Sequence, residues 1–223
     1  MAAPVGHAPA RRDSARATRT GDSDNASVTP CFTPGAQIAT ARGAVAVEDL
    51  KVGDKVLTRD NGLQPICWIG SKHVTGRDLA MNPHLRPVLI RRNALGPGLP
   101  ARDMQLSPNH RVLVASDRTA LYFEEREVLC SAKHLVNNRD IHELQTTGTT
   151  YIHFMFDRHE VVLSDGTWTE SFQPGDYSLR GIGNAQRQEI LDLFPALRTD
   201  LGLGAFLAAR RVLTPIEARQ MSD

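Results

Sequence analysis

Short runs of apolar and β-branched residues follow one another closely along most of this chain, with turn-forming residues between them. These runs are typical of strands and lie at 37–40, 45–47, 55–58, 64–70, 88–91, 111–115, 122–123, 127–129, 151–156 and 160–163. Asp60-Asn61-Gly62 is a strong hairpin signal, because its residues accept the backbone conformation of a tight turn. Many short strands separated by Gly, Pro, Asp and Asn predict a compact all-β fold.

Both ends of the chain depart from this pattern. Residues 1–30 hold almost no large apolar side chains, and such a segment cannot bury enough surface to offset its ordering entropy. Near the other end, helical spacing of apolar residues predicts a helix over 186–193 and a second helical stretch over 205–213 and 216–221. We therefore expect a disordered segment 1–30, a β domain 31–172 and a partly helical C-terminal extension 173–223.

Composition excludes several classes of function. The 223 residues carry 26 basic and 25 acidic side chains, a net charge of +1, so no general field draws the chain to nucleic acid or to a membrane. No apolar run reaches the length of a transmembrane helix, and the N-terminus lacks the apolar region of a secretory signal. We expect a soluble monomer, and both a cytoplasmic location and export by a non-classical route remain open.

The three cysteines are too widely spaced for a metal knuckle or a disulfide scaffold. Cys67 and Cys130 lie in apolar strand-like runs and are predicted to be core residues. Cys31 differs, because it stands where the N-terminal segment gives way to the β domain, within Thr29-Pro30-Cys31-Phe32-Thr33-Pro34-Gly35. A thiol at such a junction suits a nucleophile that attacks its own backbone. We expect no metal and no organic cofactor.

Four blocks occur in order after that junction. They are the Cys31 segment with Val47-Glu48-Asp49-Leu50-Lys51-Val52-Gly53-Asp54, then Leu106-Ser107-Pro108-Asn109-His110, then Tyr151 to Glu160, and finally Gly166-Thr167-Trp168-Thr169-Glu170-Ser171-Phe172. Together they resemble the Hint superfamily, the shared fold of inteins and hedgehog autoprocessing domains, over residues 31–172. The opening block is most similar to bacterial Hint-domain proteins that begin with Cys-Phe-Thr-Pro-Gly. The resemblance implies a horseshoe-like all-β fold.

The resemblance also implies an autocatalytic N-to-S acyl shift. Cys31 would attack the carbonyl of Pro30 and convert a peptide bond into a thioester, in a single turnover whose substrate is the chain's own N-terminal segment. Such chemistry needs a thiolate, an acid at the departing nitrogen and donors for the oxyanion. By this resemblance His110 protonates the amide and Ser107 donates a hydrogen bond nearby. Alone, this block would be a turn with a surface histidine.

The third block adds further candidates. A strand here would place His153, Asp157 and His159 on one face, with the intervening aromatic residues in the core. Two imidazoles and a carboxylate on one face suggest an acid–base cluster, and a hydrated strand face is the alternative. His159 also matches the histidine that follows in the family's block.

The last block differs from that of splicing inteins, which end in His-Asn, because Thr169-Glu170-Ser171 stands there. Without Asn the usual succinimide cannot form, although Glu170 could cyclise and Ser171 could accept an acyl group. We therefore expect cleavage, or transfer to water or an external nucleophile, rather than full splicing. Two other interpretations remain open: a catalytically silent Hint-fold interaction module, and a cysteine hydrolase that acts on separate substrates through Cys31 and His110.

Overall fold

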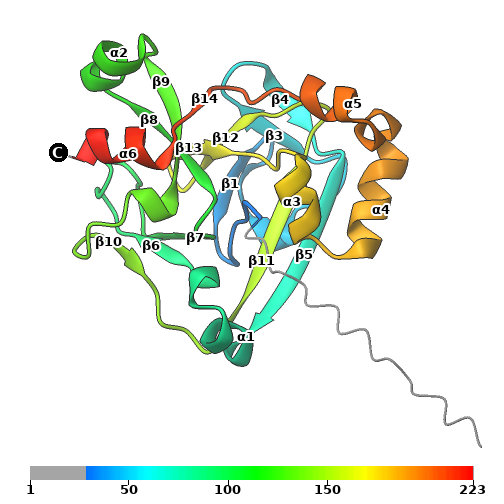
Figure 1. Cartoon of the computed structure of the whole chain (residues 1–223), viewed down its shortest axis with the longest axis horizontal. Coiled ribbons are helices and arrows are strands. Elements are labelled where there is room, and N and C mark those ends of the chain that lie inside the picture. Colours follow the sequence, from blue (N-terminus) through cyan, green and yellow to red (C-terminus); the bar gives the residue numbers. More distant parts are fainter. Residues whose placement is uncertain (1–28, 223) are drawn as a thin grey trace, which may run out of the picture.

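The computed structural model describes residues 29–222, so nearly all of the segment that was expected to be disordered lies outside the described residues. The described chain is dominated by strands and carries most of its helices at its C-terminal end (Figure 1). This arrangement confirms the all-β fold with a short helical tail.

Nine strands form the main sheet, in the order β14-β9-β8-β13-β12-β1-β3-β4, with β2 paired to β1. Their bounds are β1 Gln37–Thr40, β2 Gly43–Ala46, β3 Lys55–Thr58, β4 Gly62–Pro65, β8 Arg111–Ala115, β9 Glu127–Ser131, β12 Val161–Ser164, β13 Thr167–Glu170 and β14 Arg211–Val212. The predicted hairpin joins β3 to β4, and Gly62 supplies its left-handed backbone at φ 66°. Among the strands of residues 29–222, only β14 pairs in parallel, with β9.

Two smaller pairings complete the β structure. The long strands β5 (Trp68–Thr75) and β11 (Gly148–Met155) form an antiparallel ribbon, and β10 (Ile141–Glu143), β6 (Val88–Ile90) and β7 (Met104–Leu106) form a three-stranded sheet. The short helices between strands are α1 (Gly76–Met81), α2 (Asp117–Phe123), η1 (Val47–Asp49), η2 (Pro83–Leu85) and η3 (Ala132–His134).

Two local predictions were wrong. Residues 122–123 belong to α2 rather than to a strand, because Ser116 and Thr119 form a capping box that starts a helix at Asp117. Residues 206–213, in the segment 205–213 that was predicted to be helical, are not helical. Helix α5 ends at Ala205, and the chain then extends so that Arg211 and Val212 pair with β9.

Strand β11 has one face in the main hydrophobic core and carries His153 on the other. Ile152 and Phe154 point into the main hydrophobic core, where the Phe154 ring stacks on Phe32 with centroids 5.3 Å apart. His153 and Met155 lie on the opposite face, as period-two alternation requires. The strand ends at Met155, so the continuous face that was predicted to reach His159 does not exist.

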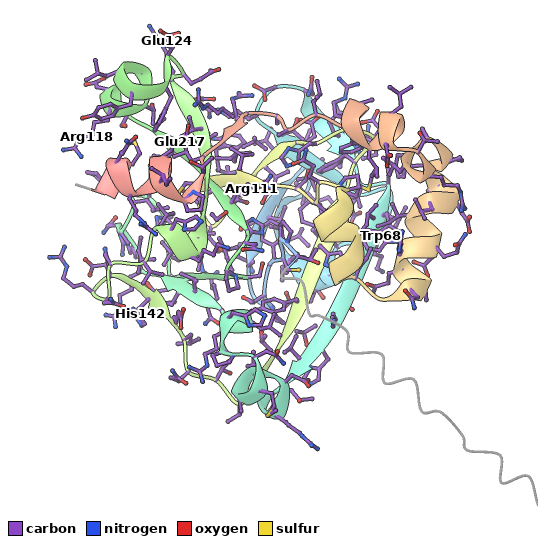
Figure 2. All side chains as sticks on the ribbon, viewed as in Figure 1. Trp68, Arg111, Arg118, Glu124, His142 and Glu217 are labelled. Carbon is purple, nitrogen blue, oxygen red and sulfur yellow. The ribbon has the colours of Figure 1, made fainter. Side chains whose placement is uncertain are left out.

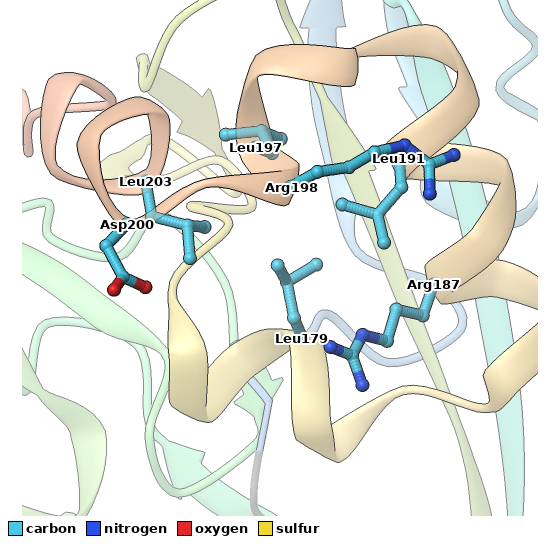
Figure 3. A pocket seen from close by; sticks show the side chains of 7 residues that line it. All are labelled: Leu179, Arg187, Leu191, Leu197, Arg198, Asp200 and Leu203. Atoms are coloured by element: carbon cyan, nitrogen blue, oxygen red, sulfur yellow. The ribbon is translucent and has the colours of Figure 1, made fainter.

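The C-terminal extension packs onto the β domain. Its helices are α3 (Asp176–Gly181), α4 (Asn184–Leu193), η4 (Pro195–Arg198), α5 (Asp200–Ala205) and α6 (Pro215–Ser222). Helices α3, α4 and α5 gather on one side, and β14 carries the chain across to α6 (Figure 1). A cavity of about 320 Å³ lies among α3, α4, η4 and α5, lined by four leucines with Arg187, Arg198 and Asp200 (Figure 3). Within the described residues no helix combines the length and the apolar character needed to cross a bilayer.

Candidate active site

Phe32 positions the candidate nucleophile, because it acts as a one-residue strand between β7 and β11. Phe32 and Ile152 exchange both backbone hydrogen bonds, at 2.8 and 3.0 Å, and Phe32 also bridges to Leu106. In antiparallel pairing the preceding residue, Cys31, then lies opposite the residues that follow these partners along β11 and β7. Those residues are His153 and Ser107. The first of them forms a non-hydrogen-bonded pair with Cys31, the arrangement in which side chains approach most closely.

The Cys31 thiol lies between an imidazole and a carbonyl. Its Sγ is 3.3 Å from Nδ1 of His153 and 3.2 Å from the carbonyl oxygen of Thr29. The side chain is only 3% exposed. The thiol has one proton, so it can donate to the carbonyl or to the imidazole, and the second choice is a route for its removal.

Ser107 is hydrogen-bonded to the backbone on both sides of the peptide bond that Cys31 would cleave. The backbone N–H of Cys31 donates to Ser107 Oγ at 2.8 Å, and the same hydroxyl donates to the Thr29 carbonyl oxygen at 2.8 Å. The Ser107 N–H donates in turn to the Cys31 carbonyl at 3.0 Å. Ser107 is fully buried and begins the turn before β8, so its hydroxyl is fixed at the nitrogen that would become the leaving group.

Burial keeps the two reactive groups neutral at rest. Burial raises the pKa of the Cys31 thiol well above its ordinary value, and the Ser107 hydrogen bond opposes this only in part. Burial lowers the pKa of His153 to about 4, and the positive charge of Lys72 acts in the same direction. A neutral imidazole beside a protonated thiol can accept its proton, after which the thiolate and the imidazolium stabilise each other.

His110 is buried beneath Phe32, with ring centroids 4.5 Å apart and the rings edge to face. Neither ring nitrogen of His110 has a hydrogen-bond partner in the described part of the chain, nor does Nε2 of His153. Burial lowers the pKa of His110 to about 4, and Glu170 opposes that effect. Buried polar groups without partners are rare and often belong to reactive sites.

These two histidines make the folded state sensitive to acid. Both pKa values fall from 6.5 to about 4 on folding, so between these pH values the unfolded chain binds protons that the folded chain does not. Their stabilising contribution is complete above pH 6.5 and is lost as the pH falls through 4. We expect the free energy of unfolding to drop by several kcal/mol across this window, at ~1.4 kcal/mol per group and pH unit. Urea titrations at pH 7, 5.5 and 4 measure the drop, and an unchanged midpoint would contradict it.

His159 and Glu170 form a second buried group. Nε2 of His159 lies 3.2 Å from Glu170 Oε2, and its Nδ1 accepts the backbone N–H of Ala209 at 2.9 Å. The carboxylate also accepts the Arg111 backbone N–H at 2.9 Å and its Nη1 at 3.0 Å. Burial opposes ionisation of Glu170, but Arg111 and His159 outweigh it and hold the pKa of the carboxyl below its ordinary value. Figure 2 labels Arg111 near the middle of the view.

Comparisons with known proteins assign the chain to a family. The family model of the Hint domain matches residues 30–176. The chain belongs to the Hint domain family. Among solved structures it is similar to a bacterial intein-like domain from Clostridium thermocellum, at 15% identity and a TM-score of 0.40, over 64% of this chain and 97% of that chain. A DnaB intein from Synechocystis sp. PCC 6803 is 10% identical with a TM-score of 0.41, over 64% and 99% of the two chains. No curated protein matches this sequence.

The Hint domain brings together most of the candidate residues that its sequence offers. Cys31 contacts both Ser107 and His153, and His110 lies against the neighbouring Phe32. His159 is buried beside Glu170 instead of contacting the thiol.

Three other predicted positions lie away from this cluster. Asp157 follows the end of β11, and its 61%-exposed carboxylate lies 3.6 Å from Arg158. Cys67 stands in the short break between β4 and β5 and is half-buried, so it is not the core residue that was predicted. Cys130 is buried in β9, as predicted.

Two features of the site were missed from the sequence. Arg111 pairs with Glu170. The clue in the sequence was that Arg111 directly follows the candidate residue His110. Ala209 acts through its backbone N–H on His159, and no side-chain pattern could announce it.

Proposed function

We propose that this Hint domain processes itself at the Pro30–Cys31 peptide bond by an N-to-S acyl shift and releases or transfers the upstream segment. One observation carries the proposal: the Cys31 thiol lies 3.3 Å from a neutral imidazole while the nitrogen of the same residue is held at 2.8 Å by Ser107 Oγ. Nucleophile, base and leaving nitrogen are thus fixed within one buried cluster.

The first step moves one proton and exchanges one bond. His153 Nδ1 takes the thiol proton, and the thiolate attacks the carbonyl carbon of Pro30. The C–N bond to Cys31 then breaks, and the C–S bond remains as a thioester. The nitrogen leaves as an amine and needs one proton, which restores the balance. Ser107 Oγ is the group at hydrogen-bond distance from that nitrogen, and His110 is the family's acid for this proton.

The second step is cleavage or transfer rather than splicing. Ring closure at Glu170 would need its carboxyl to be free and protonated. In this site the carboxylate is fully buried, is ionised and is held by Arg111 and His159. The Ser171 hydroxyl, directly after β13, accepts the Glu160 N–H at 2.9 Å and is held there by the backbone. Release at the C-terminal side therefore has no poised nucleophile, and the thioester passes to water or to an added nucleophile.

Burial of the thiol argues against a hydrolase that acts on separate substrates. Cys31 is 3% exposed, and Pro30 and Thr29 beside it are also buried. An external acyl group could not reach the thiol without movement of the chain around it. The substrate already present in the site is the peptide that leads into Cys31.

Nucleophile trapping tests the proposal. The purified chain is incubated at neutral pH with hydroxylamine or dithiothreitol and followed by intact mass. We expect two products, residues 1–30 carrying the trapping group and residues 31–223 with a free N-terminal cysteine. A chain that keeps its full mass after prolonged incubation with both reagents would instead favour a silent interaction module.

A further inference from the structure

The proposed base is enclosed by aromatic rings on both sides. The His153 imidazole stacks on Trp68, with centroids 5.1 Å apart and an angle of 25°, and lies 5.3 Å from the ring of Phe172. Gly70 is the residue paired with His153 across the ribbon, and a Cβ there would meet both Trp68 and, at 2.8 Å, His153 Nε2. The glycine therefore leaves the space through which the indole reaches the imidazole.

The indole is in turn held by the C-terminal extension. Trp68 Nε1–H donates to Glu189 Oε2 at 3.0 Å, and Figure 2 shows Trp68 beside the C-terminal helices. Trp68 is 4% exposed, so its single donor needs a partner that the fold supplies. That partner sits on α4, far from β5 in sequence.

The same part of the extension is packed firmly against the site. Trp68, Met155 and Phe172 form one apolar cluster with side chains of the extension, namely Leu179, Ile182, Ile190 and Leu197. One turn before Glu189, the Gln186 side chain donates to the Ser71 carbonyl at 2.8 Å, so α4 is attached to β5 at two points. Ser178 on α3 accepts a hydrogen bond from Thr29 Oγ1 at 3.3 Å, beside the bond to be cleaved.

We propose that Glu189 is a positioning residue for the reaction: it orients Trp68, whose ring fixes the His153 imidazole against the Cys31 thiol. The C-terminal extension is then part of the reactive site and not an appendage to it. This inference rests on the proposed function, because it assigns His153 the role of base. Three contacts carry it: Glu189 Oε2 to Trp68 Nε1 at 3.0 Å, the Trp68 and His153 ring centroids at 5.1 Å, and His153 Nδ1 to Cys31 Sγ at 3.3 Å.

Substitutions of Glu189 separate positioning from simple packing. We expect Glu189→Ala to slow cleavage roughly 10- to 100-fold, because small displacements of a reacting group cost rates of that order. Glu189→Gln keeps an oxygen that can accept the indole N–H and should restore most of the rate. Gln186→Ala removes the other attachment of α4 and serves as the matched control, with a rate near that of the wild type.

A double-mutant cycle locates the effect at the indole. Trp68→Phe keeps an aromatic ring but removes the N–H, so adding Glu189→Ala to it should slow the reaction no further. Three results would each overturn the inference. They are cleavage of the Glu189→Ala chain at the wild-type rate, a Glu189→Gln chain that is as slow as Glu189→Ala, and slowing by Glu189→Ala and Trp68→Phe that is additive in the double variant.

A measurement without turnover distinguishes this inference from the proposed function. In the Cys31→Ala background, which cannot process itself, imidazole NMR signals report on His153 directly. We expect Glu189→Ala to shift the His153 signals and Gln186→Ala to leave them in place. Unmoved signals overturn the positioning role, whether or not the wild type cleaves. If the signals shift but the wild-type chain does not cleave, Glu189 still positions His153, and only the proposed self-processing reaction is refuted.

Discussion

Replacing Cys31 with alanine is expected to abolish every product of cleavage at Pro30–Cys31. The residue supplies the thiol that lies 3.3 Å from Nδ1 of His153, and alanine has no group that could replace it as a nucleophile. The removed Sγ makes a 3.2 Å contact with the Thr29 carbonyl and belongs to a small apolar cluster. Alanine fits the same space, so the fold should survive. Intact mass after incubation with hydroxylamine measures the result.

Cys67→Ala is the matched control, because it removes a half-buried thiol outside the site. It should cleave as the wild type does. Continued cleavage of the Cys31→Ala chain at the same bond would contradict the acyl shift, because water or another side chain would then be the attacking group.

Replacing His153 with phenylalanine is expected to slow formation of the thioester by about 10²- to 10⁴-fold, the usual contribution of a general base. Phenylalanine can occupy the same slot between Trp68 and Phe172, so the packing is kept while Nδ1 is lost. The buried Nε2 of His153 has no partner in the described residues, so its removal leaves no new polar group unpaired. Rates come from quenched time courses by mass.

Two controls accompany this variant. His73→Ala removes an exposed imidazole from β5, the strand paired with β11, and should leave the rate unchanged. The urea midpoint of the His153→Phe chain should be at or above that of the wild type at pH 5, because one acid-sensitive histidine is gone. If the variant cleaves at the wild-type rate, the base lies elsewhere, and His110 is the next residue to replace.

Much of the fold and part of the site could be predicted from local pattern. Alternation along 151–156 correctly separated the core residues Ile152 and Phe154 from His153 on the other face. The segment around Cys31 was recognisable because the residues before it and the residues after it differ in composition. These are short-range properties, and a sequence displays them directly.

The pairing of thiol and base could not be predicted in this way. Cys31 and His153 are 122 residues apart, and they meet because Phe32 pairs with Ile152 in one register rather than a neighbouring one. A slip by one residue would place the imidazole on the wrong face. The sequence pointed to His110 beside Cys31, and only the strand register shows which imidazole contacts the sulfur.

Local propensity also failed where a distant contact or a cap decided the outcome. Tyr122 and Phe123 favour a strand, but the Ser116 cap starts a helix before them. Residues 205–213 have helical spacing, yet Arg211 and Val212 form backbone hydrogen bonds with β9 at the edge of the main sheet. Neither outcome is visible from the residues that adopt it.

The pairing of β14 with β9 makes the surroundings of the candidate site depend on residues that are synthesised last. Ala209 reaches His159 only when the chain has passed the helices and joined that sheet edge, and Glu189 reaches Trp68 earlier on the same path. A chain synthesised only to residue 172 has the Cys31 thiol and its proposed base but lacks these contacts. In such a chain Trp68 is without the carboxylate that orients it, so the proposed reaction should be slower there than in a chain that reaches Glu189.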